Sequence, residues 1–178
     1  EPGLIYHALG VNGAATKSFL RSENFIEQGA YVAPDLVIFG LGINDAYKPD
    51  IDWHPEEYKA RYDTLVDWFR TINPDCAFIF MTNNDSYYKR RTPNKHALDV
   101  VRVMEQLSKE HDAAVWDLFG VMGGLNSIVL WEEHRLAKSD KIHLTRAGFR
   151  LNSDLLFWGF CESSKQLFKA VASCWSGG

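Results

Sequence analysis

The sequence predicts an α/β fold in which helices cover a parallel sheet. Short apolar runs recur along the chain, stretches with helical periodicity separate them, and the runs lack the alternation of half-exposed strands. Strands and helices that alternate in this way are joined by right-handed crossovers in a parallel sheet. The 178 residues suffice for one domain with a sizeable core, and no linker or repeat divides them.

Four apolar runs are the predicted strands. In chain order they are Leu4–Leu9, Leu36–Leu41, Ala77–Met81 and Ala113–Leu118. Each is short and mostly apolar, without alternation, which is typical of a strand buried in a parallel sheet.

Three helices are predicted between and after these runs. Pro55 suits the first turn of a helix whose apolar residues recur at helical spacing as far as Ile72. A second helix is predicted from about Pro93 to His111. A third begins near Thr145, a good N-cap, and the region from Lys165 to Ala172 extends it or forms a separate short helix.

Composition argues against several kinds of partner. The formal net charge is −4, and the basic run Lys89-Arg90-Arg91 is short enough to be a solvated loop, so no nucleic-acid partner is predicted. No stretch is long enough to span a membrane, and no signal peptide precedes Glu1. The compartment is therefore not readable directly from these residues.

The cysteines and histidines predict no cofactor. Cys76, Cys161 and Cys174 show no CxxC spacing, which indicates neither a disulfide framework nor a zinc site. Cys76 is expected to be a buried thiol, and Cys161 could pair with Cys174 in an oxidising compartment. The histidines outside the motif described next show no metal-ligand spacing; they are His7, His54, His96, His111 and His134.

An Asp and a His stand three residues apart just before the third predicted helix. Asp140 can turn back onto the imidazole of His143 and hold one ring nitrogen, which leaves the other nitrogen to act as a general base. Taken alone, this spacing is a weak pattern that usually belongs to a capped loop.

Two further candidates follow apolar runs, where ligands bind in open α/β sheets. Gly13 lacks a Cβ, so its backbone N–H can approach a reacting group closely. Asn44 offers a side-chain amide that could donate to a developing oxyanion. Turn formation or helix capping is the commoner explanation of each of them when it is taken singly.

The ordered combination resembles the SGNH (GDSL-like) hydrolase family. Gly13 matches the oxyanion-hole glycine of the second family block, within Leu9-Gly10-Val11-Asn12-Gly13-Ala14, and Gly10 or Asn12 could shift that match by a few positions. Asn44 matches the asparagine of the third block, in Gly42-Ile43-Asn44-Asp45. Asp140 and His143 match the catalytic pair of the fifth block.

The resemblance implies a flavodoxin-like three-layer sandwich from which one strand is absent. The first block of the family, a strand ending in Gly-Asp-Ser, supplies the nucleophile, and no such strand precedes Leu4. In the family's sheet order 2-1-3-4-5, this central strand would lie between Leu4–Leu9 and Leu36–Leu41. We therefore expect this chain to be the C-terminal portion of a longer protein, with an upstream segment or another chain filling the gap.

One internal serine is an alternative nucleophile. Ser86 follows Asn84-Asp85 after a predicted strand, in an echo of Gly-Asp-Ser, but after the wrong strand for the family. An Asx turn is the more ordinary explanation of these residues.

Two classes of function follow from the resemblance. The leading one is an esterase that acts without metal or organic cofactor on short acyl esters such as O-acetylated carbohydrate, or transfers the acyl group, in an exported location. The second is a non-catalytic module that binds a glycan or a partner chain. A flavodoxin-like nucleotide binder is disfavoured, because no glycine-rich phosphate loop is present.

Overall fold

The computed structural model describes the backbone of residues 3–175 and the side chains of residues 3–163. By their internal contacts the residues form two compact units. The first contains the chain up to Asn84 together with Asn94–Phe119, and the second contains Asp85–Pro93 and the chain from Gly120 onward. The chain therefore passes between the units three times. The single-domain organisation expected from the sequence stays a prediction.

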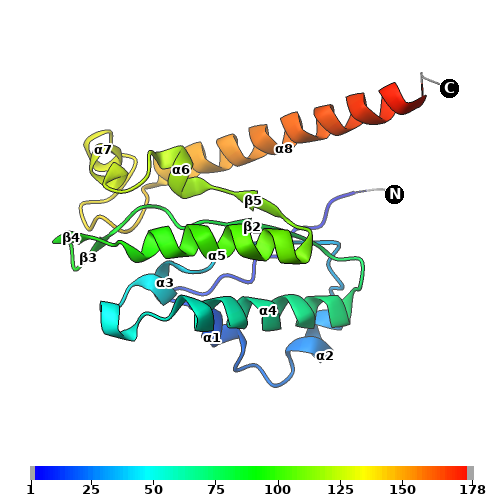
Figure 1. The fold of residues 1–178 in the computed structure, drawn as a ribbon, viewed down its shortest axis with the longest axis horizontal. Helices are drawn as coiled ribbons and strands as arrows, with labels where there is room; N and C mark the ends of the chain where they lie inside the picture. The colour runs from blue at the N-terminus through cyan, green and yellow to red at the C-terminus, as the bar shows by residue number, and fades with distance from the viewer. Residues whose placement is uncertain (1–2, 176–178) are drawn as a thin grey trace. The chain divides into compact units, whose positions relative to one another are not determined.

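A three-stranded parallel sheet forms in the first unit (Figure 1). Its order is β1 (Leu36–Phe39), β2 (Ala77–Met81) and β5 (Ala114–Trp116). The register places Phe39 opposite Phe80 and Met81 opposite Trp116. These strands confirm three of the four predicted runs and, with the intervening helices, the predicted α/β class.

The remaining predicted strand is Leu4–Leu9, and this prediction is wrong. The segment has no regular secondary structure, and Leu4 and Ile5 are 93% and 83% exposed. A parallel strand exists only through hydrogen bonds to a neighbour, and within the described chain no strand pairs with this segment. Within the described sheet β1 pairs only with β2, and its residues Leu36 and Ile38 are exposed. The prediction that this strand is buried on both faces is therefore wrong.

Two long helices cover the sheet and build the core of the first unit. Helix α4 (Pro55–Ile72) has the predicted bounds and buries Tyr62, Leu65 and Phe69. Helix α5 (His96–His111) begins later than predicted, because Pro93 belongs to a hairpin and Asn94 caps the His96 N–H through its side chain. The rings of Phe39 and Phe80 stack at 5.5 Å at the centre of this core.

Shorter elements position the loops of the first unit. They are α1 (Thr16–Phe19), α2 (Phe25–Ala30), α3 (Ile43–Ala46) and the 3₁₀ turn Asp50–Asp52. Helix α6 (Leu118–Met122) leads from the first unit into the second.

The second unit contains a hairpin, a short helix and a long one. Strands β3 (Tyr87–Tyr88) and β4 (Thr92–Pro93) are antiparallel, and the basic run between them forms their exposed turn. Helix α7 (Ser127–Glu133) is followed by a loop and then by α8 (Arg146–Trp175). The Thr145 hydroxyl accepts the Gly148 N–H at 3.2 Å, which confirms the predicted N-cap, and α8 continues through the Lys165–Ala172 region.

None of the described helices is both long and apolar enough to cross a membrane. The Cys76 thiol is buried, as predicted. The side chain of Cys174 lies outside the described residues, so its pairing with Cys161 remains untested.

Candidate active site

Asp140 and His143 form a hydrogen-bonded pair in a tight loop of the second unit. A backbone bridge joins Ala137 to Leu144, and the Lys138 N–H donates to the His143 carbonyl at 2.8 Å, so the ends of the loop are held together. The Asp140 Oδ2 accepts from His143 Nδ1 at 2.9 Å. The His143 side chain is 60% exposed, and its Nε2 bonds to no described residue. This is the geometry expected of the predicted general base.

Asp140 also organises the backbone of this loop. Its Oδ1 accepts the N–H groups of Ile142 and His143, both at 2.9 Å. Partial burial raises the pKa of Asp140, but the hydrogen bonds from the His143 backbone and ring and from Ile142 outweigh it, so this pKa lies below the usual aspartate value. The Asp140 carboxylate is therefore ionised at neutral pH in the folded loop.

Gly13 lies at a turn that requires glycine. The turn is closed by the Ala14 N–H, which donates to the Val11 carbonyl at 3.0 Å, and Gly13 has φ +74°, in the left-handed region. Its own N–H donates to no described residue.

Asn44 lies on α3 and contacts the Gly13 turn. Its Nδ2 donates to the Ala14 carbonyl at 2.9 Å, which brings the two predicted oxyanion-hole residues together within the first unit. An amide NH₂ has two hydrogens, so one can hold the loop while the other remains available. The pair formed by Gly13 and Asn44 and the pair formed by Asp140 and His143 belong to different units, and all four roles stay predictions.

A buried clamp that the sequence analysis missed joins the Gly13 and Asn44 loops. Asp45 is 3% exposed and accepts both the Thr16 N–H, at 3.0 Å, and the Thr16 hydroxyl, at 2.6 Å. Arg61 Nε donates to the same hydroxyl at 2.9 Å. The signal was an acidic residue directly after Asn44, but no local pattern pairs it with a threonine so far upstream.

Two buried tyrosines support the start of the Asn44 loop. Tyr58 and Tyr62 of α4 donate their hydroxyls to the Leu41 carbonyl at 3.2 and 2.9 Å. Burial raises the pKa of both phenols well above the usual tyrosine value. Gly42 is next along the chain, with φ +131°, and a Cβ there would lie 2.1 Å from the Tyr58 hydroxyl. Only glycine fits this approach.

Of two internal serines, Ser86, the alternative nucleophile predicted above, is not placed for that role. Ser86 is 2% exposed, which removes its hydroxyl from any substrate in this conformation. Ser18 is exposed on α1, where its Oγ accepts the Ala15 N–H at 3.1 Å.

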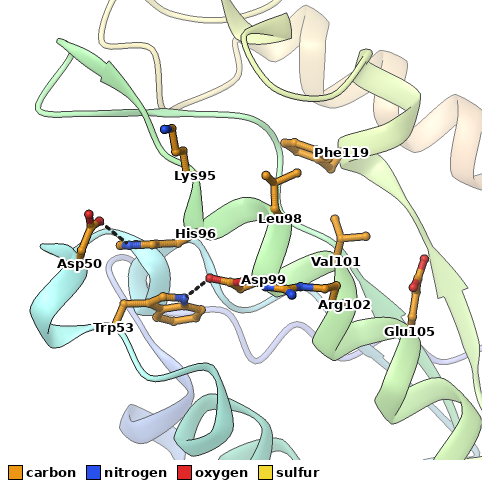
Figure 2. Close-up of a pocket in the computed structure, with 10 residues that line it drawn as sticks. All are labelled: Asp50, Trp53, Lys95, His96, Leu98, Asp99, Val101, Arg102, Glu105 and Phe119. Atoms are coloured by element: carbon orange, nitrogen blue, oxygen red, sulfur yellow. Dashed lines mark hydrogen bonds and ion pairs between the residues drawn. The ribbon is translucent and has the colours of Figure 1, made fainter.

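A hollow of about 840 Å³ lies in the first unit, lined by residues that include Trp53, His96 and Asp99 (Figure 2). Trp53 and His96 stack at 5.3 Å, and Trp53 Nε1 donates to Asp99 at 2.8 Å. The His96 ring bonds through Nε2 to Asp50 and through Nδ1 to the carbonyl of Ala46, both at 2.9 Å. Ala46 ends α3, so this wall braces the helix that carries Asn44.

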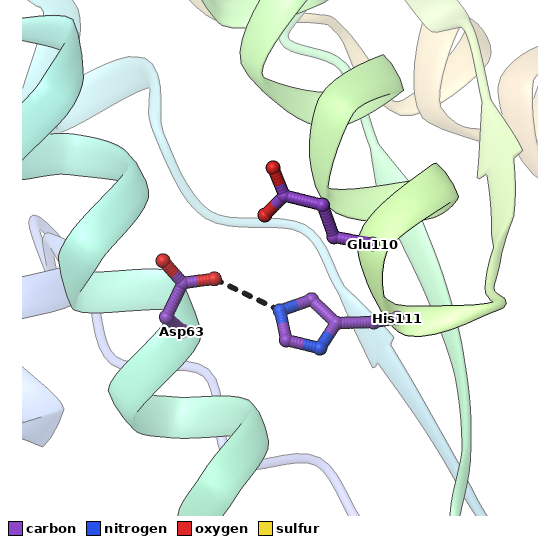
Figure 3. A group of neighbouring side chains, drawn as sticks. All are labelled: Asp63, Glu110 and His111. Atoms are coloured by element: carbon purple, nitrogen blue, oxygen red, sulfur yellow. Dashed lines mark hydrogen bonds and ion pairs between the residues drawn. The ribbon is translucent and has the colours of Figure 1, made fainter.

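A second cluster, Asp63, Glu110 and His111, has three potential metal-ligand atoms within 4.8 Å of one another (Figure 3). Lys59 already supplies a cation there, with its Nζ 2.9 Å from Asp63 and 2.5 Å from Glu110. Hydrogen bonds to both carboxylates outweigh the effect of burial and raise the Lys59 pKa. The cluster is therefore a salt-bridge network between α4 and α5.

The parallel sheet and the Asp140–His143 loop are of the kind found in α/β serine hydrolases. The sequence model of the GDSL-like lipase/acylhydrolase family matches residues 2–151, and the chain belongs to this family. No curated protein matches the chain.

Solved structures share this fold at low sequence identity. A peptidoglycan O-acetylesterase superposes with a TM-score of 0.81 at 20% identity, over 89% of this chain and 46% of that protein. A lipase/acylhydrolase from Enterococcus faecalis gives a TM-score of 0.61 at 21% identity, over 81% and 69% of the two chains. An acetyl xylan esterase gives 0.60 at 16%, over 84% and 78%. The chain thus spans less than half the length of the first of these proteins.

Proposed function

We propose that this chain carries the base and the oxyanion hole of an ester hydrolase that removes short acyl groups, such as acetyl, from carbohydrate. The observation that supports this most directly is the exposed imidazole of His143, held through Nδ1 by an ionised Asp140. The esterases among the structural neighbours make acylated carbohydrate the substrate class we favour, and an exported location suits such a substrate.

The proposed reaction is acyl transfer through a serine. His143 Nε2 takes the proton of the serine hydroxyl while the serine oxygen attacks the ester carbonyl carbon. The resulting oxyanion accepts hydrogen bonds from the Gly13 N–H and the Asn44 amide, each worth about 3 kcal/mol. The tetrahedral intermediate then expels the sugar oxygen, which takes the proton from His143. His143 then takes a proton from water as the water oxygen attacks the acyl carbon; the serine oxygen is expelled, takes that proton back from His143, and the short acid leaves.

We further propose that the serine comes from a strand outside these residues. The buried position of Ser86 argues against an internal nucleophile. The open edge of β1 and the exposed apolar segment Leu4–Leu9 are the two flanks expected of a central strand that would lie between them. On this proposal the chain by itself hydrolyses esters poorly or not at all.

Turnover of p-nitrophenyl acetate tests the proposal. The chain is compared with a longer form that carries the upstream Gly-Asp-Ser block, each with His143→Ala and with His134→Ala, which removes another exposed imidazole of the same unit. We expect activity in the longer form alone, lost with His143→Ala and kept with His134→Ala. Activity of the short chain that depends on His143 would contradict an outside nucleophile. No activity in either form would favour the non-catalytic binding module.

A further inference from the structure

Lys141, close to the proposed general base, contacts Tyr87 through both its backbone carbonyl and its ammonium. Lys141 lies between Asp140 and His143, and its carbonyl accepts the backbone N–H of Tyr87 at 2.8 Å. Its ammonium lies over the Tyr87 ring, 4.8 Å from the ring centroid. The Tyr87 hydroxyl in turn donates to Asn126 at 2.9 Å. All of these residues belong to the second unit.

The backbone at Lys141 is in a conformation that needs support. Its φ is +56°, in the left-handed region that a residue with a long side chain rarely adopts. Such a conformation persists where surrounding contacts impose it, and it is common at functional sites. Here the Tyr87 contact and the hydrogen bond from the Lys141 N–H to Lys138, at 3.0 Å, impose it. The backbone of Lys141 is thus fixed by these bonds, and its ammonium has a cation–π contact with the Tyr87 ring.

No carboxylate among the described side chains pairs with the Lys141 ammonium. Asp140, the nearest acid in sequence, has both oxygens committed to His143 and Ile142. The turn that follows Tyr88 adds three exposed basic residues, Lys89, Arg90 and Arg91. The second unit has ten basic and six acidic residues, against nine and seventeen in the first. The base-bearing unit is therefore cationic within an acidic chain.

We propose that Lys141, fixed by Tyr87, is a subsite for a carboxylate on the sugar whose ester is cleaved, so that the substrate class is an acylated acidic polysaccharide. This rests on the proposed function for one step: a base that protonates the departing sugar oxygen must lie against that sugar. The residues that flank His143 then contact the sugar, and Lys141 is two positions away. A positioned cation selects an anionic sugar over a neutral one at this place.

Binding of ester-free sugars tests this subsite independently of any hydrolysis. Fluorescein-labelled oligogalacturonate and an uncharged galactan oligosaccharide of equal length are titrated with the chain, and anisotropy gives the Kd. We expect at least about tenfold tighter binding of the acidic oligosaccharide at low salt, and a smaller difference at high salt.

Four variants locate the effect. Lys141→Gln should weaken binding of the acidic oligosaccharide about five- to tenfold, because it removes one charged hydrogen-bond donor. Lys109→Gln removes an exposed lysine of α5 in the first unit and should change nothing. Tyr87→Phe keeps the ring under the ammonium and should bind like the wild type, whereas Tyr87→Ala should behave like Lys141→Gln.

Three results would overturn the proposal. They are equal affinity for the acidic and neutral oligosaccharides, equal loss in the Lys141 and Lys109 variants, and equally tight binding of a single-stranded oligonucleotide of matched charge. Since the probes carry no ester, selective binding by the chain, together with no hydrolysis by the longer form that carries the Gly-Asp-Ser block, would refute the proposed function and leave the subsite intact. Hydrolysis without selective binding would do the reverse.

Discussion

The Asp45 carboxylate holds Thr16 by two hydrogen bonds, 2.6 Å to its hydroxyl and 3.0 Å to its backbone N–H, with both residues buried. Asp45 follows Asn44 on α3, and Thr16 begins α1, shortly after Gly13. A single side-chain contact therefore sets the spacing of the two predicted oxyanion donors. Arg61, whose Nη2 lies 3.7 Å from Asp45, supplies the opposite charge.

Removing the hydroxyl of Thr16 should destabilise the chain without changing the shape of the site. We expect Thr16→Val to lower the free energy of unfolding by about 1–3 kcal/mol, because Asp45 loses a buried charged hydrogen bond. Urea denaturation measures this. Thr16→Ser keeps the hydroxyl and loses one methyl group, so it should cost about 1 kcal/mol. A Ser variant less stable than the Val variant would show that packing, and not the hydrogen bond, matters at this position.

Gly42→Ala should be among the most damaging small substitutions in the chain. The new Cβ would lie 2.1 Å from the Tyr58 hydroxyl, at a φ of +131°. We expect a loss of about 3 kcal/mol or more in the free energy of unfolding. Combining it with Tyr58→Phe removes the nearer of two clashing oxygens and leaves the φ strain and the 2.8 Å approach to Asn83 Oδ1. The double variant should therefore lose less than the two single variants added together, and additive losses would contradict the clash.

The hydrogen bonds that the Asp140 carboxylate accepts should give this group a lowered pKa in the folded chain. Because its pKa is lowered in the folded chain, its contribution to stability is present above the unfolded value of about 3.9. This contribution is lost as the pH falls through the lower folded value. The amide resonances of Ile142 and His143, which donate to this carboxylate, should shift with a midpoint below about 3.9. Asp140→Asn should abolish the shift, and a midpoint above that value would contradict the geometry.

Lys59 should exclude divalent metals from the cluster of Asp63, Glu110 and His111. We expect zinc to leave the Tm of the wild type unchanged, because the ammonium occupies the space between the carboxylates. Lys59→Met keeps most of the stem, removes the ammonium from the two carboxylates of the cluster and should raise the Tm by about 5 °C when zinc is added. The control Lys109→Met, which replaces a neighbouring exposed lysine, should leave the Tm unchanged by zinc. Zinc stabilisation of the wild type would refute this account.

The sequence was most informative where local periodicity and burial agree. Helix α4 could be placed from Pro55 to Ile72 because its apolar residues recur at helical spacing and all meet the same core. The Asp140–His143 contact could be predicted because the two residues are close in the chain. Three strands could be located because continuous apolar runs are typical of a buried parallel sheet.

The remaining features depend on partners distant in the chain. Leu4–Leu9 has the composition of a strand, but a strand also needs a neighbour to bond with, and composition carries no information about one. The Asp45–Thr16 clamp and the Lys59 network join residues from separate elements, so no spacing rule identifies them. The hairpin Tyr87–Pro93 is too short for its alternation to register as a pattern.

The way the chain passes between its two units has a consequence for synthesis on the ribosome. The hairpin Tyr87–Pro93 belongs to the second unit, yet α5 and β5 of the first unit follow it in the chain. Tyr87 therefore leaves the exit tunnel long before Lys141, whose carbonyl it binds. All residues of the first unit, through Phe119, are therefore synthesised before Lys141, the partner of Tyr87. The loop that carries Asp140 and His143 can therefore gain its contact with Tyr87 only after Lys141 has been synthesised, well after the hairpin has left the tunnel.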